Sequence, residues 1–201
     1  MKIVSIILFL ALGYNLGAQL LIEHQEIGKE PSYFISFDRD TIYGEVSYGK
    51  KLFGGLLNKI CFTRSDGSEF VLRANESNGF SLNGQQYESK LIDDYYFFLR
   101  PAVKGKPSLY YLEHNYVERN DNSSQMIRLH SSYGRMITNY VEMNGRMHKV
   151  YRKRFKKQAE DLFSSYPEVL EMVNNDKLDF FDLEEIITYC NKMNEGLISP
   201  N

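Results

Sequence analysis

Hydrophobic and polar residues alternate along the first three quarters of the chain, which predicts β-strands up to about Tyr151. Over residues 33–48 the alternation predicts a hairpin with its loop at Arg39–Asp40, which sets Phe37 opposite Ile42. In this register the large apolar residues share one face of the hairpin. We therefore expect the register to be well specified, because a slip of one residue would turn every side chain over.

A second hairpin is indicated by Asp66-Gly67, a dipeptide typical of two-residue type I′ turns. Such a turn pairs Arg64 with Glu69 and Phe62 with Val71. Opposite charges then face each other, and apolar residues occupy both faces of the hairpin. This predicts a two-sided core or a small barrel.

Two further hairpins are predicted at Asn83-Gly84, which pairs Phe80 with Tyr87, and at Asn144-Gly145. Between them lie two aromatic strand patterns, separated by a polar loop with glycine and proline from residue 101 to residue 107.

From Arg152 the hydrophobic period changes from two to 3.6 residues, which predicts a helix. Pro167 ends this helix and suits the first position of a second one. Asp182 and Glu185 form a capping-box pattern ahead of a third helix, for which Gly196 is a stop signal. The apolar stripe of the first helix consists of Tyr151, Phe155, Ala159, Leu162, Phe163 and Tyr166. The sequence therefore predicts an α+β fold, an antiparallel strand-rich meander or small barrel followed by about three C-terminal helices.

The N-terminus has the features of a secretory signal peptide over residues 1–18. Lys2 provides the positive charge, Ile3–Leu12 the apolar run, and Ala18 the small residue before cleavage at Gln19. The apolar run is too short to span a bilayer, which needs about 20 residues. We therefore expect an exported protein, periplasmic or extracellular, with association to the outer membrane left open and no transmembrane span in the mature chain.

The rest of the chain divides into a β-rich body over residues 19–151 and a helical tail over residues 152–201 that packs on the body. A polar segment at residues 118–125 is the best boundary within the body. Hydrophobic residues make up 43% and charged residues 25% of the 201 positions, an ordinary globular composition. Without residues 1–18 the chain has 23 basic and 26 acidic side chains, a formal charge of −3, which gives no electrostatic case for nucleic acid.

Asp38 and Asp40 raise the question of a metal site, since carboxylates bind divalent cations. We interpret them as turn residues instead, because aspartate hydrogen-bonds its own backbone in turns and the neighbouring sequence supplies few further ligands. No histidine has a partner at zinc-ligand spacing, and His148 is expected opposite Val141 in a hairpin. Motifs for serine hydrolases, zinc proteases and phosphate loops are absent from the sequence. We therefore predict no metal, no cofactor and no catalytic residue.

Two cysteines, Cys61 and Cys190, remain open to two interpretations. An exported protein allows a disulfide between them, which would close a long loop. We favour two buried small hydrophobic residues, because both fall on apolar faces.

Two surfaces are candidates for binding. Six basic residues between positions 149 and 157 indicate either a patch for anionic lipid, glycan or a partner, or the solvated face of an amphipathic helix; they are Lys149, Arg152, Lys153, Arg154, Lys156 and Lys157. Tyr43, Tyr110 and Tyr116 would form an aromatic platform for carbohydrate if they face outward, and core residues if they do not.

The motifs "DRDTIYGEV", "DGSEFVL" and "GFSLNGQQYES" resemble those of uncharacterised exported proteins of Bacteroidetes-type bacteria, which carry a Gly-Asp-Thr-Ile-x-Gly pattern behind a signal peptide. The tail segments "RFKKQAEDLFSSYPEVLEMV" and "DLEEIITYCN" are also similar to that group. Arg39 stands where the pattern has glycine. The resemblance implies a location in the cell envelope and transfers no catalytic residue.

These observations favour a non-enzymatic exported domain that binds or scaffolds an envelope protein or a glycan. The competing hypothesis is a hydrolase or glycan-processing enzyme whose site is assembled from distant strands.

Overall fold

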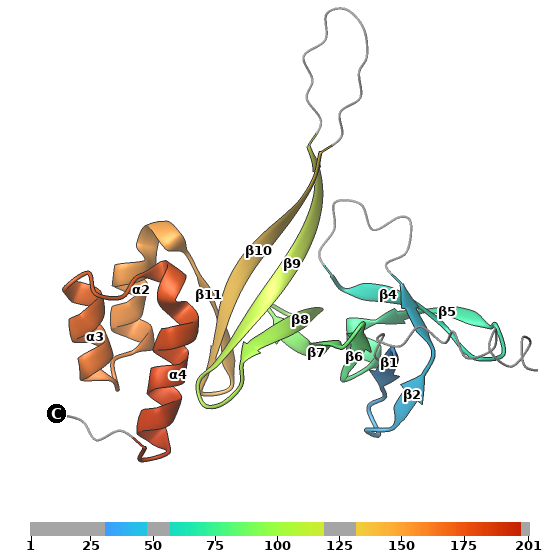
Figure 1. The fold of residues 1–201 in the computed structure, drawn as a ribbon, viewed down its shortest axis with the longest axis horizontal. Coiled ribbons are helices and arrows are strands. Elements are labelled where there is room, and N and C mark those ends of the chain that lie inside the picture. Colours follow the sequence, from blue (N-terminus) through green and yellow to red (C-terminus); the bar gives the residue numbers. More distant parts are fainter. Residues whose placement is uncertain (1–30, 48–56, 119–131, 198–201) are drawn as a thin grey trace, which may run out of the picture. The chain divides into compact units, whose positions relative to one another are not determined.

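The computed structural model describes residues 31–47, 57–118 and 132–197 (Figure 1). The fold is α+β, with antiparallel strands followed by helices, as the sequence predicted. The strands are β1 (Tyr33–Ile35), β2 (Thr41–Tyr43), β3 (Glu45–Ser47), β4 (Lys59–Thr63), β5 (Glu69–Arg73), β6 (Gly79–Leu82), β7 (Gln85–Ile92), β8 (Tyr95–Val103), β9 (Ser108–Glu118), β10 (Ser132–Met143) and β11 (Arg146–Val150). The helices are α2 (Phe155–Leu162), α3 (Pro167–Asn174) and α4 (Leu183–Asn194), with short 3₁₀ turns η1 (Ala74–Glu76), η2 (Arg152–Arg154) and η3 (Phe180–Asp182).

Within residues 31–47, 57–118 and 132–197 the strands form two antiparallel sheets. Eight strands make the larger sheet in the order β11-β10-β9-β8-β7-β6-β1-β2, in which β6 to β11 are a meander. The smaller sheet has the order β3-β4-β5. Within the described residues, the chain passes from the larger sheet to the smaller one at Gly44, where a side chain would collide with the Thr63 carbonyl and the Phe62 ring. Glycine is therefore required at this junction.

β1 and β2 form the predicted hairpin, but its loop was predicted at Arg39–Asp40 and lies at residues 37–39, and the predicted register is wrong. Phe34, not Phe37, pairs with Ile42, and Phe37 is exposed in the loop. The loop has three residues, 37–39, because Arg39 adopts a left-handed backbone conformation with φ 68°. The register differs from the predicted one by an odd number of residues, so Phe34 faces the core instead of Ile35.

The predicted register of the Asp66-Gly67 hairpin is wrong as well, here by one residue, since Phe62 pairs with Phe70 and Thr63 with Glu69. Gly67, with φ 82°, is the third residue of a three-residue loop and not the second residue of a type I′ turn. The amide N–H of Gly67 donates to the Arg64 carbonyl at 2.9 Å, which closes this loop. In the observed register the apolar rings of the two strands lie on one face.

The other two hairpins have the predicted register, with Phe80 opposite Tyr87 and Val141 opposite His148. A further two-residue turn at Asp93-Asp94, which we did not predict, joins β7 to β8 with both residues at positive φ. The loop predicted over residues 101–107 is shorter in the structure, because β8 continues through a bulge to Val103.

Two large apolar cores of the described residues hold the sheets and the helices together. The first joins the smaller sheet to the adjoining strands of the larger one; its buried members include Phe34, Val46, Ile60, Phe62, Leu72, Phe80, Tyr87 and Phe98. The second joins the helices to β9, β10 and β11; its buried members include Leu109, Val141, Val150, Phe155, Ala159, Phe163, Val169, Leu183, Ile186, Ile187 and Cys190. Residues 119–125 of the predicted internal boundary lie outside the described residues.

The helical region follows most of the predicted pattern. The stripe from Phe155 to Tyr166 is buried, but Tyr151 is exposed, because β11 ends before it and the helix begins only after η2. Pro167 is the first residue of α3, and Gly196, at φ 69°, follows the end of α4. The predicted Asp182–Glu185 capping box is wrong: Asp179 and Asp182 form that box around η3, one turn earlier.

Candidate functional site

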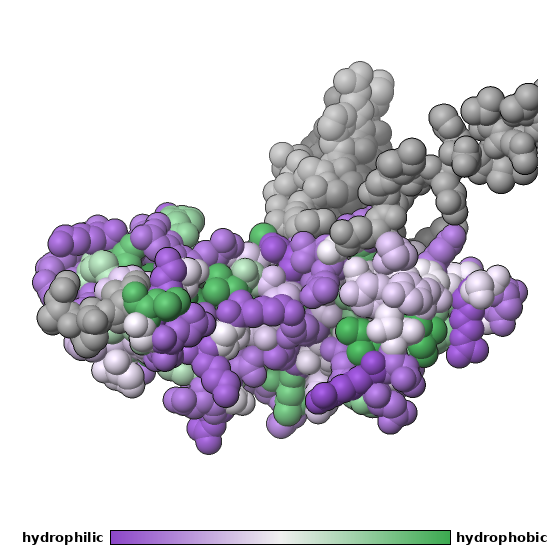
Figure 2. Space-filling model, turned by 60° about the horizontal axis from the view of Figure 1, so that its bottom comes forward, coloured by the Kyte–Doolittle hydropathy of each residue, from purple (hydrophilic) through white to green (hydrophobic). Residues whose placement is uncertain are grey.

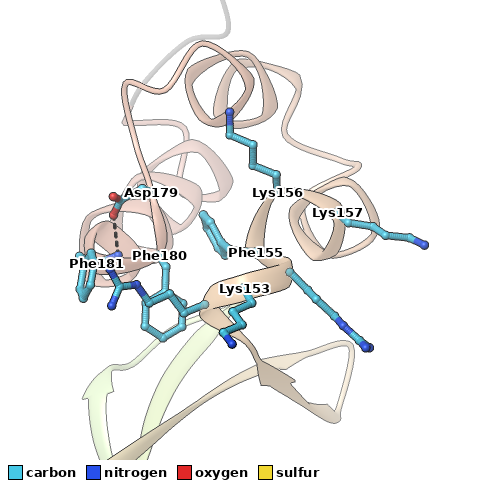
Figure 3. Close-up of a pocket in the computed structure, with 9 residues that line it drawn as sticks. Lys153, Phe155, Lys156, Lys157, Asp179, Phe180 and Phe181 are labelled. Atoms are coloured by element: carbon cyan, nitrogen blue, oxygen red, sulfur yellow. Dashed lines mark hydrogen bonds between the residues drawn. The ribbon is translucent and has the colours of Figure 1, made fainter.

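An open groove of about 560 Å³ lies beside the start of α2 (Figure 3). Two segments line it: residues 152–157, which belong to η2 and α2, and residues 179–181, which cap and begin η3. Five of the nine lining residues are basic, and one, Asp179, is acidic. The groove therefore includes five of the six residues of the basic patch found in the sequence. We call it the basic groove.

A series of cation–ring and edge-on ring contacts connects the aromatic residues of the basic groove. The Arg152 guanidinium lies 4.5 Å from the centre of the Phe181 ring. Phe181 meets Phe180 edge-on at 5.7 Å between ring centres, and Phe180 meets Phe155 edge-on at 6.2 Å. Because Phe155 is buried and Phe181 is 67% exposed, the series runs from the core to the surface.

Hydrogen bonds fix η3, and one of them uses the carboxylate of Asp179, the acidic residue of the groove. Asp179 Oδ1 accepts from the Phe181 N–H at 2.7 Å, shown dashed in Figure 3. The Asp179 N–H donates to Asp182 Oδ2 at 2.8 Å. This reciprocal capping fixes the backbone that carries both Phe180 and Phe181. The Asp179 carboxylate is thus directed at its own turn.

The basic side chains of the groove are exposed and point in different directions. Figure 3 shows Lys153, Lys156 and Lys157 leaving the chain on different sides. Lys156 Nζ pairs with Asp176 Oδ1 at 2.6 Å, between two exposed side chains, a geometry that contributes little stability. The cations therefore form a spread positive surface and do not converge on one point.

A second, smaller groove of about 450 Å³ adjoins the same segment and is lined by Tyr151 and residues 152–154. The Lys149 ammonium lies 5.1 Å from the centre of the Tyr151 ring. Tyr151 is 47% exposed, so a second exposed aromatic ring carries a cation on its face beside the basic groove.

The three tyrosines considered for a carbohydrate platform are not brought together. Tyr43 is exposed on β2, where its ring meets that of Tyr33 edge-on. Tyr110 is buried on β9, so it cannot serve as an outward platform. The side chain of Tyr116 lies outside the described residues.

Tyr110 belongs to a polar network on the larger sheet. Its hydroxyl donates to Glu88 Oε2 at 2.9 Å, and Lys90 Nζ bridges Glu142 at 2.8 Å and Glu88 at 3.5 Å. Lys104 Nζ adds a second contact to Glu88 at 2.8 Å. Two carboxylates thus meet at one ammonium, and a pair of carboxylates is what a hydrolase of the glycoside type would require.

The electrostatics of this network favour fixed charges. Burial by itself would raise the pKa of Glu88, but hydrogen bonds from Lys104 and Tyr110 and the nearby ammonium charges hold it below its ordinary value. Burial would lower the pKa of Lys90, yet its bonds with Glu142 and Tyr110 raise it. A carboxyl with a lowered pKa stays ionised at neutral pH and is a poor general acid.

The cysteines and the possible metal ligands were the remaining candidates from the sequence, and the surroundings of the cysteines are those of structural residues. Both cysteines are free thiols: Cys190 is buried among the helices, and Cys61 lies partly buried on β4. Burial raises the pKa of the Cys190 thiol to about 12, as expected of an inert core residue. In the part of the chain that the structure describes, no three His, Cys, Asp or Glu side chains are grouped closely enough to hold a metal ion.

Sequence reasoning found the basic half of the groove and missed Asp179, Phe180 and Phe181. The signal was present in "DFFD", where two aspartates at capping-box spacing enclose two phenylalanines. We placed the capping box one turn later, so the two rings were not recognised as part of a fixed turn.

On the face shown in Figure 2, hydrophilic residues cover most of the described surface and hydrophobic ones gather in small separate groups.

Comparisons with known proteins gave no match to this chain among family models, curated proteins or solved structures. Of the helices in the described ranges, none combines the length and apolar character needed to cross a membrane.

Proposed function

We propose that this chain is an exported binding domain of the bacterial cell envelope, and that the basic groove binds an anionic ligand. The observation that carries the proposal is the concentration of charge: five basic residues and one acidic residue line the groove, in a chain whose formal net charge is −2. A local positive surface on a chain of opposite net charge orients it toward an anionic partner.

The architecture supports a binding role for this surface. The reciprocal hydrogen bonds of Asp179 and Asp182 fix η3, and Phe155 anchors the other wall in the helical core. Aromatic and cationic side chains are thus presented on rigid elements. Such preorganisation lowers the entropic cost of binding. Export rests on the signal-peptide pattern of residues 1–18, which lie outside the described residues.

The competing hypothesis of a hydrolase or glycan-processing enzyme has its best support in Glu88 and Glu142. Both carboxylates contact Lys90, and Glu88 also contacts Lys104 and Tyr110. These contacts satisfy the carboxylates with protein partners and favour a structural role for the network. We therefore prefer binding to catalysis.

The experiment compares two triple variants of the purified protein. Lys153→Gln/Arg154→Gln/Lys157→Gln removes three exposed charges from the groove, and Lys59→Gln/Arg64→Gln/Arg146→Gln removes three exposed charges elsewhere. Binding to inorganic polyphosphate, heparin and polyglutamate is measured at two salt concentrations. We expect at least one polyanion to bind with salt-dependent affinity, and the groove variant alone to lose it.

Equal losses in the two triple variants would show that binding follows net charge and not the groove. Turnover of a broad panel of glycans and esters by the purified protein would contradict the non-enzymatic assignment.

A further inference from the structure

We infer that the ligand of the basic groove is the surface of an anionic phospholipid bilayer, with Phe181 entering the headgroup region. This inference rests on the proposed function and names the partner of the same site.

The directions of the cations favour an extended anionic surface over a single small anion. A site for one phosphate needs several donors that converge within hydrogen-bond distance of the same oxygens. Here Lys153, Lys156 and Lys157 diverge (Figure 3), and the groove is open and not enclosed. Diverging charges contact several phosphates at once when those phosphates lie spread over a plane, as lipid headgroups do.

The exposed rings distinguish a bilayer from a soluble polyanion. Phe181 and Tyr151 lie at the surface beside the basic residues, 67% and 47% exposed, at a cost in exposed apolar area. Each ring carries a cation on its face, Arg152 at 4.5 Å and Lys149 at 5.1 Å. In a membrane interface such pairs are favourable, because the ring enters the apolar boundary while the long basic side chain reaches the phosphates.

An acidic peptide is the other macromolecule that the charge would suit. The carboxylates of a peptide could pair with the cations. The exposed Phe181 ring would be buried only if the peptide also carried an apolar side chain at the right spacing. A bilayer supplies apolar surface wherever the ring enters. The combination of spread charge and exposed aromatic rings therefore favours the bilayer.

The first experiment measures co-sedimentation of the full purified chain with vesicles of pure phosphatidylcholine or of phosphatidylcholine with 30% phosphatidylglycerol. All variants share the same N-terminus, so differences between them report on the groove. We expect binding to the anionic vesicles to fall on the order of 100-fold in Lys153→Gln/Arg154→Gln/Lys157→Gln, at about fivefold per charge. The control Lys59→Gln/Arg64→Gln/Arg146→Gln is expected to change it less than threefold.

The second experiment uses the fact that the chain contains no tryptophan. Phe181→Trp introduces one fluorophore at the tip of the groove, and Tyr95→Trp places one at a similarly exposed site, 70% exposed at the first residue of β8. We expect the emission of Phe181→Trp to shift to shorter wavelength with anionic vesicles and not with polyphosphate. The emission of Tyr95→Trp is expected to stay unchanged.

Each outcome bears on a different statement. Groove-dependent binding to polyphosphate or polyglutamate without binding to anionic vesicles overturns the bilayer inference and leaves the proposed function standing. Vesicle binding without the shift of Phe181→Trp overturns the insertion of the ring. If the unmodified protein binds neither the anionic vesicles nor any of the polyanions, both the inference and the proposed function are overturned.

Discussion

Arg39 and Gly67 occupy equivalent positions in two loops of the same geometry. In each loop the third residue has a left-handed backbone, φ 68° for Arg39 and 82° for Gly67. The N–H of that residue donates to the carbonyl three positions earlier, Ser36 at 3.1 Å and Arg64 at 2.9 Å. Glycine adopts this conformation freely, whereas a residue with a Cβ atom is strained in it by roughly 1–2 kcal/mol.

Arg39→Gly is therefore expected to stabilise the protein by about 0.5–1 kcal/mol, since relief of strain exceeds the added entropy of the unfolded chain. Gly67→Ala is the matched control and is expected to destabilise by about 1 kcal/mol, because a Cβ there meets no atom within 4 Å and only the backbone is strained. Urea unfolding at neutral pH measures both. A loss of stability in Arg39→Gly would show that the arginine side chain stabilises the loop through contacts of its own.

Arg100→Ala is expected to destabilise the protein by about 2–3 kcal/mol. Arg100 Nε lies 2.9 Å from Glu113 Oε1, and Glu113 is only 9% exposed, so the change removes a positive charge beside a buried carboxylate. Arg73→Ala removes an arginine from an exposed pair, 3.0 Å from Glu76, and is expected to cost less than about 1 kcal/mol. Chemical unfolding of both variants gives the comparison. Similar values for the two would mean that burial adds nothing to the Arg100–Glu113 pair.

Alkaline pH is expected to destabilise the fold through Tyr110. Burial, together with the Glu88 carboxylate, raises the pKa of Tyr110 to about 12 from an ordinary value near 10. A raised pKa in the folded state means that this tyrosine supports folding fully below pH 10, and that the support is lost as pH rises through 12. In Tyr110→Phe this loss is absent. Between pH 10 and 12 the free energy of unfolding is therefore expected to fall less steeply in the variant than in the original protein, and equal slopes would contradict the assignment.

Export is expected to remove residues 1–18. When the full sequence is expressed in a bacterial host and the exported protein is purified, intact-mass spectrometry is expected to give a chain that begins at Gln19. Lys2→Glu removes the positive charge of the leader and is expected to slow processing. An exported chain that still carries Met1 would contradict the signal-peptide assignment.

How far the sequence predicted the fold depends on whether the information was local. At Asn83-Gly84 and Asn144-Gly145 the two residues of the turn are enough to specify its geometry. The structure has the predicted register in both hairpins. The two hairpins with wrong registers have three-residue loops. In one of them an arginine takes the left-handed position, which no propensity scale favours.

The candidate site shows the same division. The basic residues from 152 to 157 are consecutive and were visible as a run of charge. Their partners Phe180 and Phe181 are more than twenty positions away and reach the groove only because α2 and η3 pack on one core. The sequence pattern could not predict the surroundings of Tyr110 on β9 either, because its contacts Glu88 and Lys90 lie on β7, two strands away in the sheet.

Only Gly44 separates β2 from β3. Neither strand can therefore detach from its sheet without moving the other. Withdrawal of β3 would pull the chain across the Phe62 ring and disturb the Phe34–Phe62 edge contact, 4.8 Å between ring centres, which binds the two sheets from within. The smaller sheet is therefore no detachable accessory. We expect it to unfold together with β1 and β6 of the larger sheet, because a shortened chain that lacks it would expose Phe34 and Phe80 to water.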